Sequence, residues 1–180
     1  MRQPEVLIGV AGGIAAYKTA TVVSRLVQAT CGVSVILTPS AETLVGRATF
    51  AALTGRVVGT ETIDPDHFPL GAHIELARRA EILCIAPATA NVLAKLAQGL
   101  ADDLLGSAYL CFRGPVLVAP AMNSEMWQKA AVQRNIAQLR QDGVQIIEPE
   151  SGWLSCREVG AGRMAEPEQI VADILAHLKR

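Results

Sequence analysis

The chain has 180 residues, of which 51% are hydrophobic and only 18% are charged. This length suits one globular domain, and this composition is apolar enough to bury a sizeable core. The 16 basic and 17 acidic residues nearly cancel, which argues against a nucleic-acid-binding protein. No apolar run approaches the roughly 20 residues that a membrane-spanning helix needs, so we expect no membrane association.

Cysteine and histidine usage points to a protein of the reducing cytoplasm without a metal site. The four cysteines form no C-x-x-C pair, and they are Cys31, Cys84, Cys111 and Cys156. Free thiols in a reducing compartment are the natural interpretation. The three histidines are widely separated and lack ligand spacing, so no metal is expected.

Five short, continuous apolar runs predict parallel strands that are covered on both faces. They are 6–10, 33–37, 82–86, 116–119 and 144–147. Helical patterns separate them. The first lies between the first two strands, with Ala16, Ala20, Val23 and Val27 on one side and Gly32 as its C-terminal cap. Further helices are expected over 41–53, 74–80, 91–110 with a break, 124–139 and 167–178. This rhythm predicts an α/β fold with a doubly wound, Rossmann-like parallel sheet and helices on both faces.

Ligands bind beyond the carboxyl ends of the strands in such sheets, which makes the segments after each strand candidate site segments. Gly12 and Gly13 follow the first strand, where backbone N–H groups can approach an anion. They do not form a G-x-G-x-x-G fingerprint or a P-loop, and a plain tight turn is the alternative. Thr38 and Ser40 follow the second strand, although Ser40 alone would also suit a helix N-cap.

Thr89 and Asn91 follow the third strand and could bind a phosphate, a sugar or a ring edge. One of them could instead be a helix cap. Three polar strand ends at adjacent positions favour a mononucleotide phosphate site over three separate caps. Asn123 follows the fourth strand in "PAMNSEMW", where Asn123 or Ser124 could simply cap the next helix.

Two further residues are candidates for proton transfer. His73 starts a helix, where the helix dipole favours the neutral imidazole, although a surface or capping histidine would look the same. Cys156 lies in "SGWLSCREVGAGRM", which is too glycine-rich to predict regular structure and which suggests a lid. An exposed, inert cysteine is the alternative at this position.

Five motifs occur in one order along the chain. They are GGIAAYK at 12–18, HIEL at 73–76, PATAN at 87–91, PAMN-x-x-MW at 120–127 and C-x-x-x-G-x-G-R-M at 156–164. Together they resemble the homo-oligomeric flavin-containing cysteine decarboxylases, which have a flavoprotein-like fold. The likeness is greatest to the branch that acts on 4'-phosphopantothenoylcysteine in coenzyme A biosynthesis. The motifs span nearly the whole chain.

The resemblance implies FMN as the cofactor and a decarboxylation that gives 4'-phosphopantetheine. FMN would take hydride from the carbon next to sulfur, giving a thioaldehyde that can hold the electrons when CO2 leaves. The resulting enethiolate would then be reduced. The implied cofactor contacts are Gly12, Gly13, Ile14, Thr38, Ser40, Ala88, Thr89 and Asn91.

The resemblance also assigns roles around the substrate. His73 would remove the thiol proton, Asn123 would bind the leaving carboxylate, and Cys156 would protonate the enethiolate carbon. Met126 would line the substrate pocket and Arg78 would help to hold the substrate. The sequence departs from the family pattern at Ala80-Glu81, close to Arg78.

Family members assemble as trimers or dodecamers with FMN at a subunit boundary, so a homotrimer or homododecamer is expected here.

We expect residues 1–180 to form a single FMN-binding decarboxylase domain without the ligase domain of many bacterial relatives. Whether the chain is a standalone enzyme or a fragment stays open. The alternatives are a peptidyl-cysteine decarboxylase of peptide-antibiotic modification and a non-catalytic, flavin-binding regulatory protein.

Overall fold

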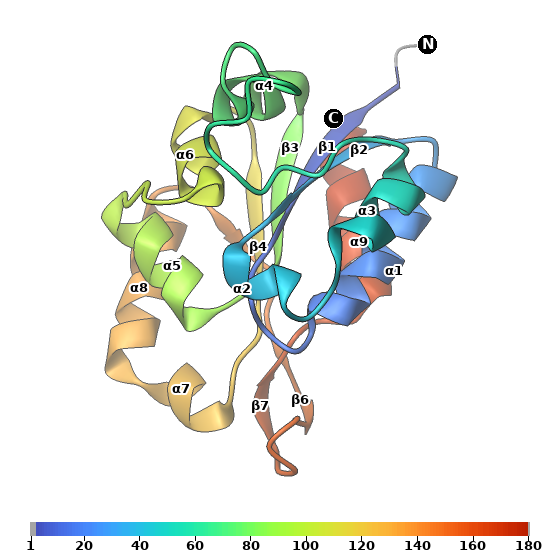
Figure 1. Ribbon diagram of the computed structural model, residues 1–180. Helices are drawn as coiled ribbons and strands as arrows, with labels where there is room; N and C mark the ends of the chain where they lie inside the picture. The colour runs from blue at the N-terminus through green and yellow to red at the C-terminus, as the bar shows by residue number, and fades with distance from the viewer. Residues whose placement is uncertain (1–2, 180) are drawn as a thin grey trace.

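The computed structural model describes residues 3–179, and its centre is a five-stranded parallel sheet (Figure 1). The strands lie in the order β2-β1-β3-β4-β5, and each neighbouring pair is parallel. Their bounds are β1 (Glu5–Val10), β2 (Gly32–Leu37), β3 (Ile82–Ala88), β4 (Val116–Pro120) and β5 (Gln145–Ile146). The predicted doubly wound parallel sheet is therefore confirmed.

The central strands are buried on both faces, as their continuous apolar sequences predict. All residues of β2 and β3 are buried. The register places Val6 beside both Val33 and Ile82, so β1 is held between two apolar strands. Because chain order reverses direction between β1 and β3, a crevice for a ligand is expected at the carboxyl ends of these two strands.

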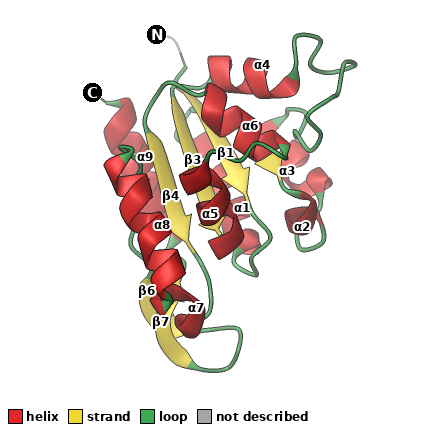
Figure 2. Ribbon diagram, turned by 90° about the vertical axis from the view of Figure 1, so that its left-hand side faces the viewer, coloured by secondary structure: helices red, strands yellow, loops and turns green. Residues whose placement is uncertain are grey.

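Helices cover the sheet on two sides (Figures 1 and 2). One apolar cluster includes α1 (Ala16–Gln28), α3 (Arg47–Thr54) and α9 (Pro167–Leu178). The opposite cluster includes α4 (Ala72–Arg79), α5 (Ala90–Gln98), α6 (Leu104–Cys111) and α8 (Ala130–Gln141). Two short helices, α2 (Pro39–Glu42) and α7 (Ser124–Gln128), follow directly on β2 and β4.

Three helix boundaries differ from the prediction. The helix predicted over 41–53 is split into α2 and α3 at Gly46, which has extended backbone and starts α3. The helix predicted over 124–139 is split at Lys129, which is also extended. Gly32 is the first residue of β2 and does not cap α1. The C-cap of α1 is Ala29, and the chain then turns through Thr30, which has a φ of 62°.

The glycine-rich segment around Cys156 is a regular β-hairpin, so its prediction as an irregular loop was wrong. β6 (Glu150–Trp153) pairs antiparallel with β7 (Val159–Arg163), and the hairpin projects beyond the carboxyl end of the sheet. A Cβ at Gly160 would lie 2.1 Å from Ser124 Oγ, and one at Gly162 would lie 2.4 Å from the Met122 carbonyl oxygen. The glycines therefore allow the hairpin to pack closely against the first residue of α7 and the segment before it.

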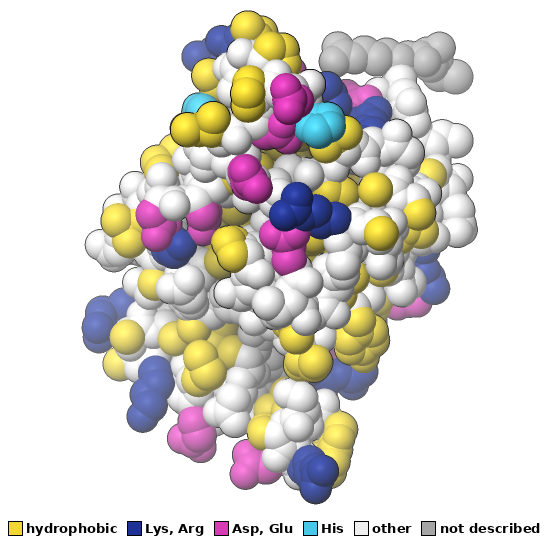
Figure 3. All heavy atoms as spheres, in the orientation of Figure 1, with side chains coloured by type: hydrophobic (Ala, Val, Ile, Leu, Met, Phe, Trp, Pro, Cys, Tyr) yellow, Lys and Arg dark blue, Asp and Glu magenta, His cyan; other side chains and the backbone are white. Residues whose placement is uncertain are grey.

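On the face drawn in Figure 3, acidic and basic side chains are interspersed. Within residues 3–179, none of the helices combines the length and the apolar character that crossing a bilayer requires.

Candidate active site

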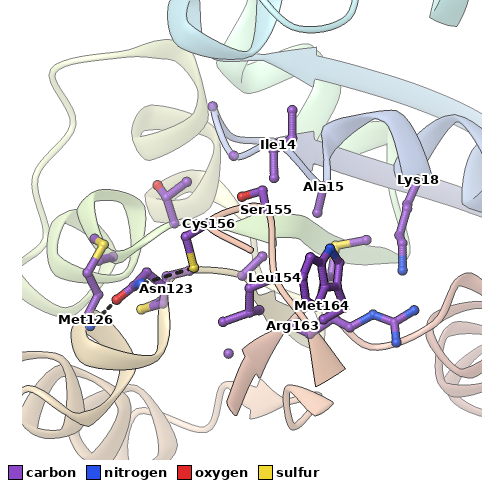
Figure 4. A pocket seen from close by; sticks show the side chains of 18 of the residues that line it. Ile14, Ala15, Lys18, Asn123, Met126, Leu154, Ser155, Cys156, Arg163 and Met164 are labelled. Atoms are coloured by element: carbon purple, nitrogen blue, oxygen red, sulfur yellow. Dashed lines mark hydrogen bonds between the residues drawn. The ribbon is translucent and has the colours of Figure 1, made fainter. Parts of the chain in front are cut away.

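A cavity of about 690 Å³ lies at the carboxyl ends of β1, β3 and β4, where the sheet topology predicts a ligand crevice. Its volume is in the range of small-molecule and cofactor sites. The walls come from the turn after β1, the start of α5, the segment around α7 and the β6–β7 hairpin (Figure 4). The sequence-predicted residues that line it are Gly12, Gly13, Ile14, Thr89, Asn123, Met126 and Cys156.

The backbone of the turn after β1 can be approached closely by α2 and by a ligand, because two glycines form it. A Cβ at Gly12 would lie 2.2 Å from the Cβ of Ser40, so only glycine fits between this turn and α2. The Gly13 N–H donates to Ala11 and its carbonyl accepts from Ala16, and these bonds fix the turn into α1. No side chain caps α1 and its first turn holds no acidic residue. The turn therefore suits an anionic or polar ligand.

Of the two polar segments after β2 and β3, only the second reaches the cavity. Thr38, not Ser40, is the N-cap of α2, because its hydroxyl accepts from the Ala41 N–H. Thr38 is buried, and Ser40 is exposed beside Gly12. Neither lines the cavity.

Thr89 both caps a helix and lines the cavity, so the two interpretations of this residue are compatible. Its hydroxyl accepts from the Val92 N–H at 3.3 Å, and α5 begins at the next residue. The neighbouring candidates differ, because Ala88 is buried in β3 and Asn91 is exposed on α5. Neither of these two residues lines the cavity.

Asn123 is held in one orientation by the backbone around it. Its Oδ1 accepts from the N–H groups of Glu125, at 2.8 Å, and Met126, at 3.4 Å, which makes it the N-cap of α7. Because Oδ1 is occupied, the amide Nδ2 is the group left to donate towards the cavity. There it donates to Cys156 Sγ at 3.5 Å (Figure 4).

Cys156 lies in the turn of the β6–β7 hairpin and is exposed. The turn is closed by the Arg157 N–H, which donates to Leu154, and by the Leu154 N–H, which donates to Glu158. Arg157 has a left-handed φ of 67°. Besides Asn123, the thiol contacts the Glu158 carboxylate, with Sγ 3.7 Å from Oε2. The turn thus holds a thiol between a donor and an acceptor at the cavity wall.

The other cysteines lie outside this cavity. Cys31 and Cys84 are buried in the core, and Cys111 is exposed at the end of α6. Burial raises the pKa of Cys84 to about 12, so this thiol stays protonated and unreactive at neutral pH. Cys156 is therefore the thiol that is placed to act on a ligand in the cavity.

His73 and Arg78 do not line the cavity. Both lie on α4, which Figure 1 places at the opposite end of the molecule from the hairpin. Arg78 is exposed and His73 is half-buried. The Nδ1 of His73 is buried and has no hydrogen-bond partner among residues 3–179. A single chain therefore does not bring the predicted base to the predicted carboxylate ligand Asn123.

Several cavity residues were missed as candidates, above all Lys18 and Arg163. Lys18 Nζ is 3.1 Å from both carboxylate oxygens of Glu166, and Arg163 pairs with the same carboxylate. Both cations lie within the quoted motifs, at 18 in GGIAAYK and at 163 in the C-x-x-x-G-x-G-R-M segment. Their place within these motifs was the signal that could have found them.

The sequence and the fold are similar to those of known flavoproteins. The family model described as "Flavoprotein" matches residues 1–179. The coenzyme A biosynthesis bifunctional protein CoaBC of Bacillus subtilis is 48% identical over 166 residues, which cover 92% of this chain and 41% of that protein. The chain thus spans about 41% of the length of this curated relative.

Two solved structures share the fold over nearly the whole chain. A PPC decarboxylase mutant complexed with pantothenoylaminoethenethiol has a TM-score of 0.88 and 30% identity, covering 99% of this chain and 100% of that one. The FMN-dependent cysteine decarboxylase SpaF has a TM-score of 0.81 and 33% identity, covering 98% and 96%. With its cavity at the β1/β3 crevice and a family match over residues 1–179, this chain belongs to the flavoprotein family.

Proposed function

We propose that this chain is an FMN-dependent decarboxylase that converts 4'-phosphopantothenoylcysteine to 4'-phosphopantetheine in coenzyme A biosynthesis. The observation that carries the proposal is the contact of Asn123 with Cys156 in the cavity at the carboxyl ends of the strands. In this proposal the Asn123 amide would bind a carboxylate and the adjacent Cys156 thiol would donate a proton. The similarity to a coenzyme A biosynthesis protein and to a PPC decarboxylase supports the same reaction.

The side of the cavity formed by the turn after β1 and the start of α5 has residues that suit FMN. The cradle at Gly12 and Gly13, which a side chain at Gly12 would fill, and the hydroxyl of Thr89 would hold polar parts of the cofactor. Ile14, whose side chain is 59% exposed at the cavity, supplies apolar contact for a flat ring. Ser40 and Thr38 would support the cradle from α2. When bound, FMN supplies a reversible hydride acceptor.

Asn123 would bind the substrate carboxylate. The cap of α7 fixes its Oδ1 on two backbone N–H groups, so its Nδ2 is presented to the cavity as a donor. A donor positioned before the substrate arrives lowers the cost of orienting the carboxylate for departure. Met126, which is 46% exposed, would form the apolar side of the same subsite.

Cys156 would supply the proton that the reaction consumes. The bond between the carboxylate and its neighbouring carbon breaks, CO2 leaves with no net change of oxidation state, and a C–H bond replaces it. That new bond needs one proton at carbon, and the Cys156 thiol is held next to the amide that would orient the carboxylate. Glu158, whose carboxylate contacts the thiol, could return the proton to it.

His73 would act as the base from a neighbouring copy of the chain. Within one chain it lies on α4, away from Asn123 and Cys156. A homotrimer or homododecamer with the cofactor at a subunit boundary would bring His73 and Arg78 of one copy to the cavity of the next. With the ring hydrogen on the buried Nδ1, Nε2 would be the nitrogen that accepts the substrate proton.

The same proposal treats residues 1–180 as one FMN-binding decarboxylase domain, which acts in the cytoplasm as its free cysteines suggest. It is tested with purified protein and FMN by measuring bound flavin absorbance and product mass after addition of 4'-phosphopantothenoylcysteine. Loss of CO2 alone supports the proposal. Loss of CO2 plus two hydrogens would assign the chain to oxidative cysteine decarboxylation. Bound flavin without any product would make it a flavin-binding regulator.

A further inference from the structure

The cavity has a second end that the proposed decarboxylation chemistry does not use. Among the described residues that line it, Lys18 and Arg163 are the only charged ones, and both are cationic. Figure 4 shows Lys18 and Arg163 on one side of the cavity and Asn123 with Cys156 on the other. The side chains of Leu154 and Met164 lie between the two groups. An elongated ligand could therefore be bound by an anionic end and a reacting end at once.

The two cations share one counter-ion. Glu166 contacts Lys18 through both carboxylate oxygens, each at 3.1 Å, and also pairs with Arg163. Glu166 does not line the cavity. One carboxylate behind two cations leaves a net positive charge facing the cavity. Lys18 is also well held, since its side chain is only 15% exposed.

The position of Arg163 depends on the hairpin. A Cβ at Gly152 on the paired strand would lie 3.0 Å from Arg163 Nη1 and 3.1 Å from its Cδ. The missing side chain at Gly152 thus lets the arginine lie across β6. Because Arg163 and Cys156 belong to the same hairpin, a ligand that contacts the thiol is placed to contact the guanidinium as well.

We propose that Lys18 and Arg163 bind a phosphate monoester carried by the substrate at the end remote from its reacting cysteine. This inference rests on the proposed function and names the group that selects its substrate. A phosphate monoester carries nearly two negative charges at neutral pH. Arginine binds such a group through two parallel N–H donors and lysine adds a point charge.

The phosphate of the substrate suits this site better than the phosphate of FMN. The cofactor cradle at Gly12 and Gly13 lies at the strand ends, whereas Lys18 lies farther along α1 and Arg163 lies on the hairpin. The hairpin carries the proton donor for the substrate, so its cation faces the same ligand. The apolar stretch at Leu154 and Met164 would accommodate the uncharged chain between the phosphate and the cysteine.

The test compares 4'-phosphopantothenoylcysteine with dephosphorylated pantothenoylcysteine. The ratio of their kcat/KM values is measured for the wild type, Lys18→Gln, Arg163→Gln and the double variant. Loss of one charged contact should lower the ratio about tenfold, and loss of both about 100-fold. Lys18→Arg should keep most of the ratio. Arg25→Gln is the matched control, because Arg25 lies on α1 like Lys18 and pairs with a glutamate of α9, Glu168, but does not line the cavity.

Flavin-binding measurements show whether the two cations bind the phosphate of FMN or the phosphate of the substrate. FMN and riboflavin are titrated into each apoprotein, and binding is measured by quenching of flavin fluorescence. Unchanged preference for FMN over riboflavin, together with a lowered substrate ratio, supports the inference. Variants that lose FMN but keep riboflavin would overturn it and assign the cations to the cofactor. An unchanged substrate ratio in the double variant would overturn it as well.

Direct binding keeps the inference independent of turnover. If the wild type decarboxylates neither compound, the proposed function fails. Calorimetric titration with 4'-phosphopantetheine and with pantetheine then decides the phosphate site. Tighter binding of the phosphorylated compound, lost in the double variant and kept in Arg25→Gln, supports it. Equal binding of the two compounds by the wild type overturns it.

Discussion

Asn123 donates its side-chain amide to the Sγ atom of Cys156 at 3.5 Å, although 33 positions separate the two residues. The amide comes from the helix cap after β4 and the thiol from the hairpin turn. The contact depends on the packing of the hairpin against the segment before α7, where the Met122 N–H donates to Gly162. Two residues that would act on the same substrate are thereby joined in the free protein.

Asn123→Asp should abolish decarboxylation while FMN stays bound. The aspartate keeps the oxygen that caps α7, but it places a negative charge against the substrate carboxylate. Such a repulsion costs several kcal/mol, so we expect at least about a thousandfold loss of turnover. Flavin absorbance and product mass measure the two outcomes. A variant that decarboxylates at the wild-type rate would remove Asn123 from the carboxylate subsite.

Cys156→Ser should leave CO2 release intact but stop the reaction at an unsaturated product. A serine hydroxyl is a much weaker acid than a thiol, so protonation at carbon becomes the slow step. Mass spectrometry of the product distinguishes the saturated thiol from a species with two fewer hydrogens. Cys111→Ser is the matched control, because Cys111 is exposed but lies outside the cavity. Full turnover to the saturated thiol by Cys156→Ser would contradict the proton-donor role.

His73→Ala and Asn123→Asp should complement each other in mixed oligomers. If His73 serves the neighbouring cavity, a mixed trimer contains an intact site wherever a wild-type His73 faces a wild-type Asn123. With a cyclic arrangement, about one site in three is then intact. The two variants are co-expressed with different tags, purified in sequence and assayed for product. Mixed oligomers as inactive as either parent would place both groups in one chain.

Much of the fold was predictable, because its signals are local in sequence. The strands are continuous apolar runs, and the strand-end rule pointed to Gly12, Thr89 and Asn123, all of which line the cavity. Each of these residues lies within three positions of the end of the strand that positions it. Local pattern and global topology give the same answer there.

The hairpin and the cationic end were missed because their signals are not local. Gly160 and Gly162 look like loop residues, but they make room for Ser124 and for the Met122 carbonyl, far away in sequence. Lys18 finds its partner Glu166 across 148 positions. The reverse holds for His73. Its motif predicts a site residue, but within a single chain it does not line the cavity.

Gly12→Ala should weaken both the fold and flavin binding. The new methyl group would lie 2.2 Å from Ser40 Cβ, so the turn after β1 and α2 must move apart. Overpacking of this kind costs about 1–3 kcal/mol. Urea unfolding and FMN titration measure the two effects. Gly46→Ala is the control, because a Cβ there would meet nothing within 4 Å.

Removing the Ser40 side chain tests whether its contact causes the effect of Gly12→Ala. The double variant Gly12→Ala, Ser40→Gly should recover part of the lost stability and FMN affinity, because the 2.2 Å contact disappears. The Ser40 carbonyl carbon would still lie 3.0 Å from the new methyl group, so recovery should be incomplete. No recovery at all would mean that the cost of Gly12→Ala arises away from α2.

Acid should destabilise the protein partly through Glu166. The hydrogen bond from Lys18, with added attraction from Arg163, lowers the pKa of this carboxyl below its usual 4.5. As the pH falls, the carboxyl of the unfolded chain therefore takes up a proton before that of the folded chain. This contribution to stability is present above pH 4.5 and is lost as pH falls through the lower, folded-state pKa.

Urea unfolding of the wild type at several pH values between about 6 and 3 should show the decline. In Glu166→Gln this part of the decline should disappear, and in Lys18→Gln it should shrink, because Lys18 is the largest cause of the shift. A Glu166→Gln variant with the same acid dependence as the wild type would show that the shared ion pair does not contribute to the stability of the fold.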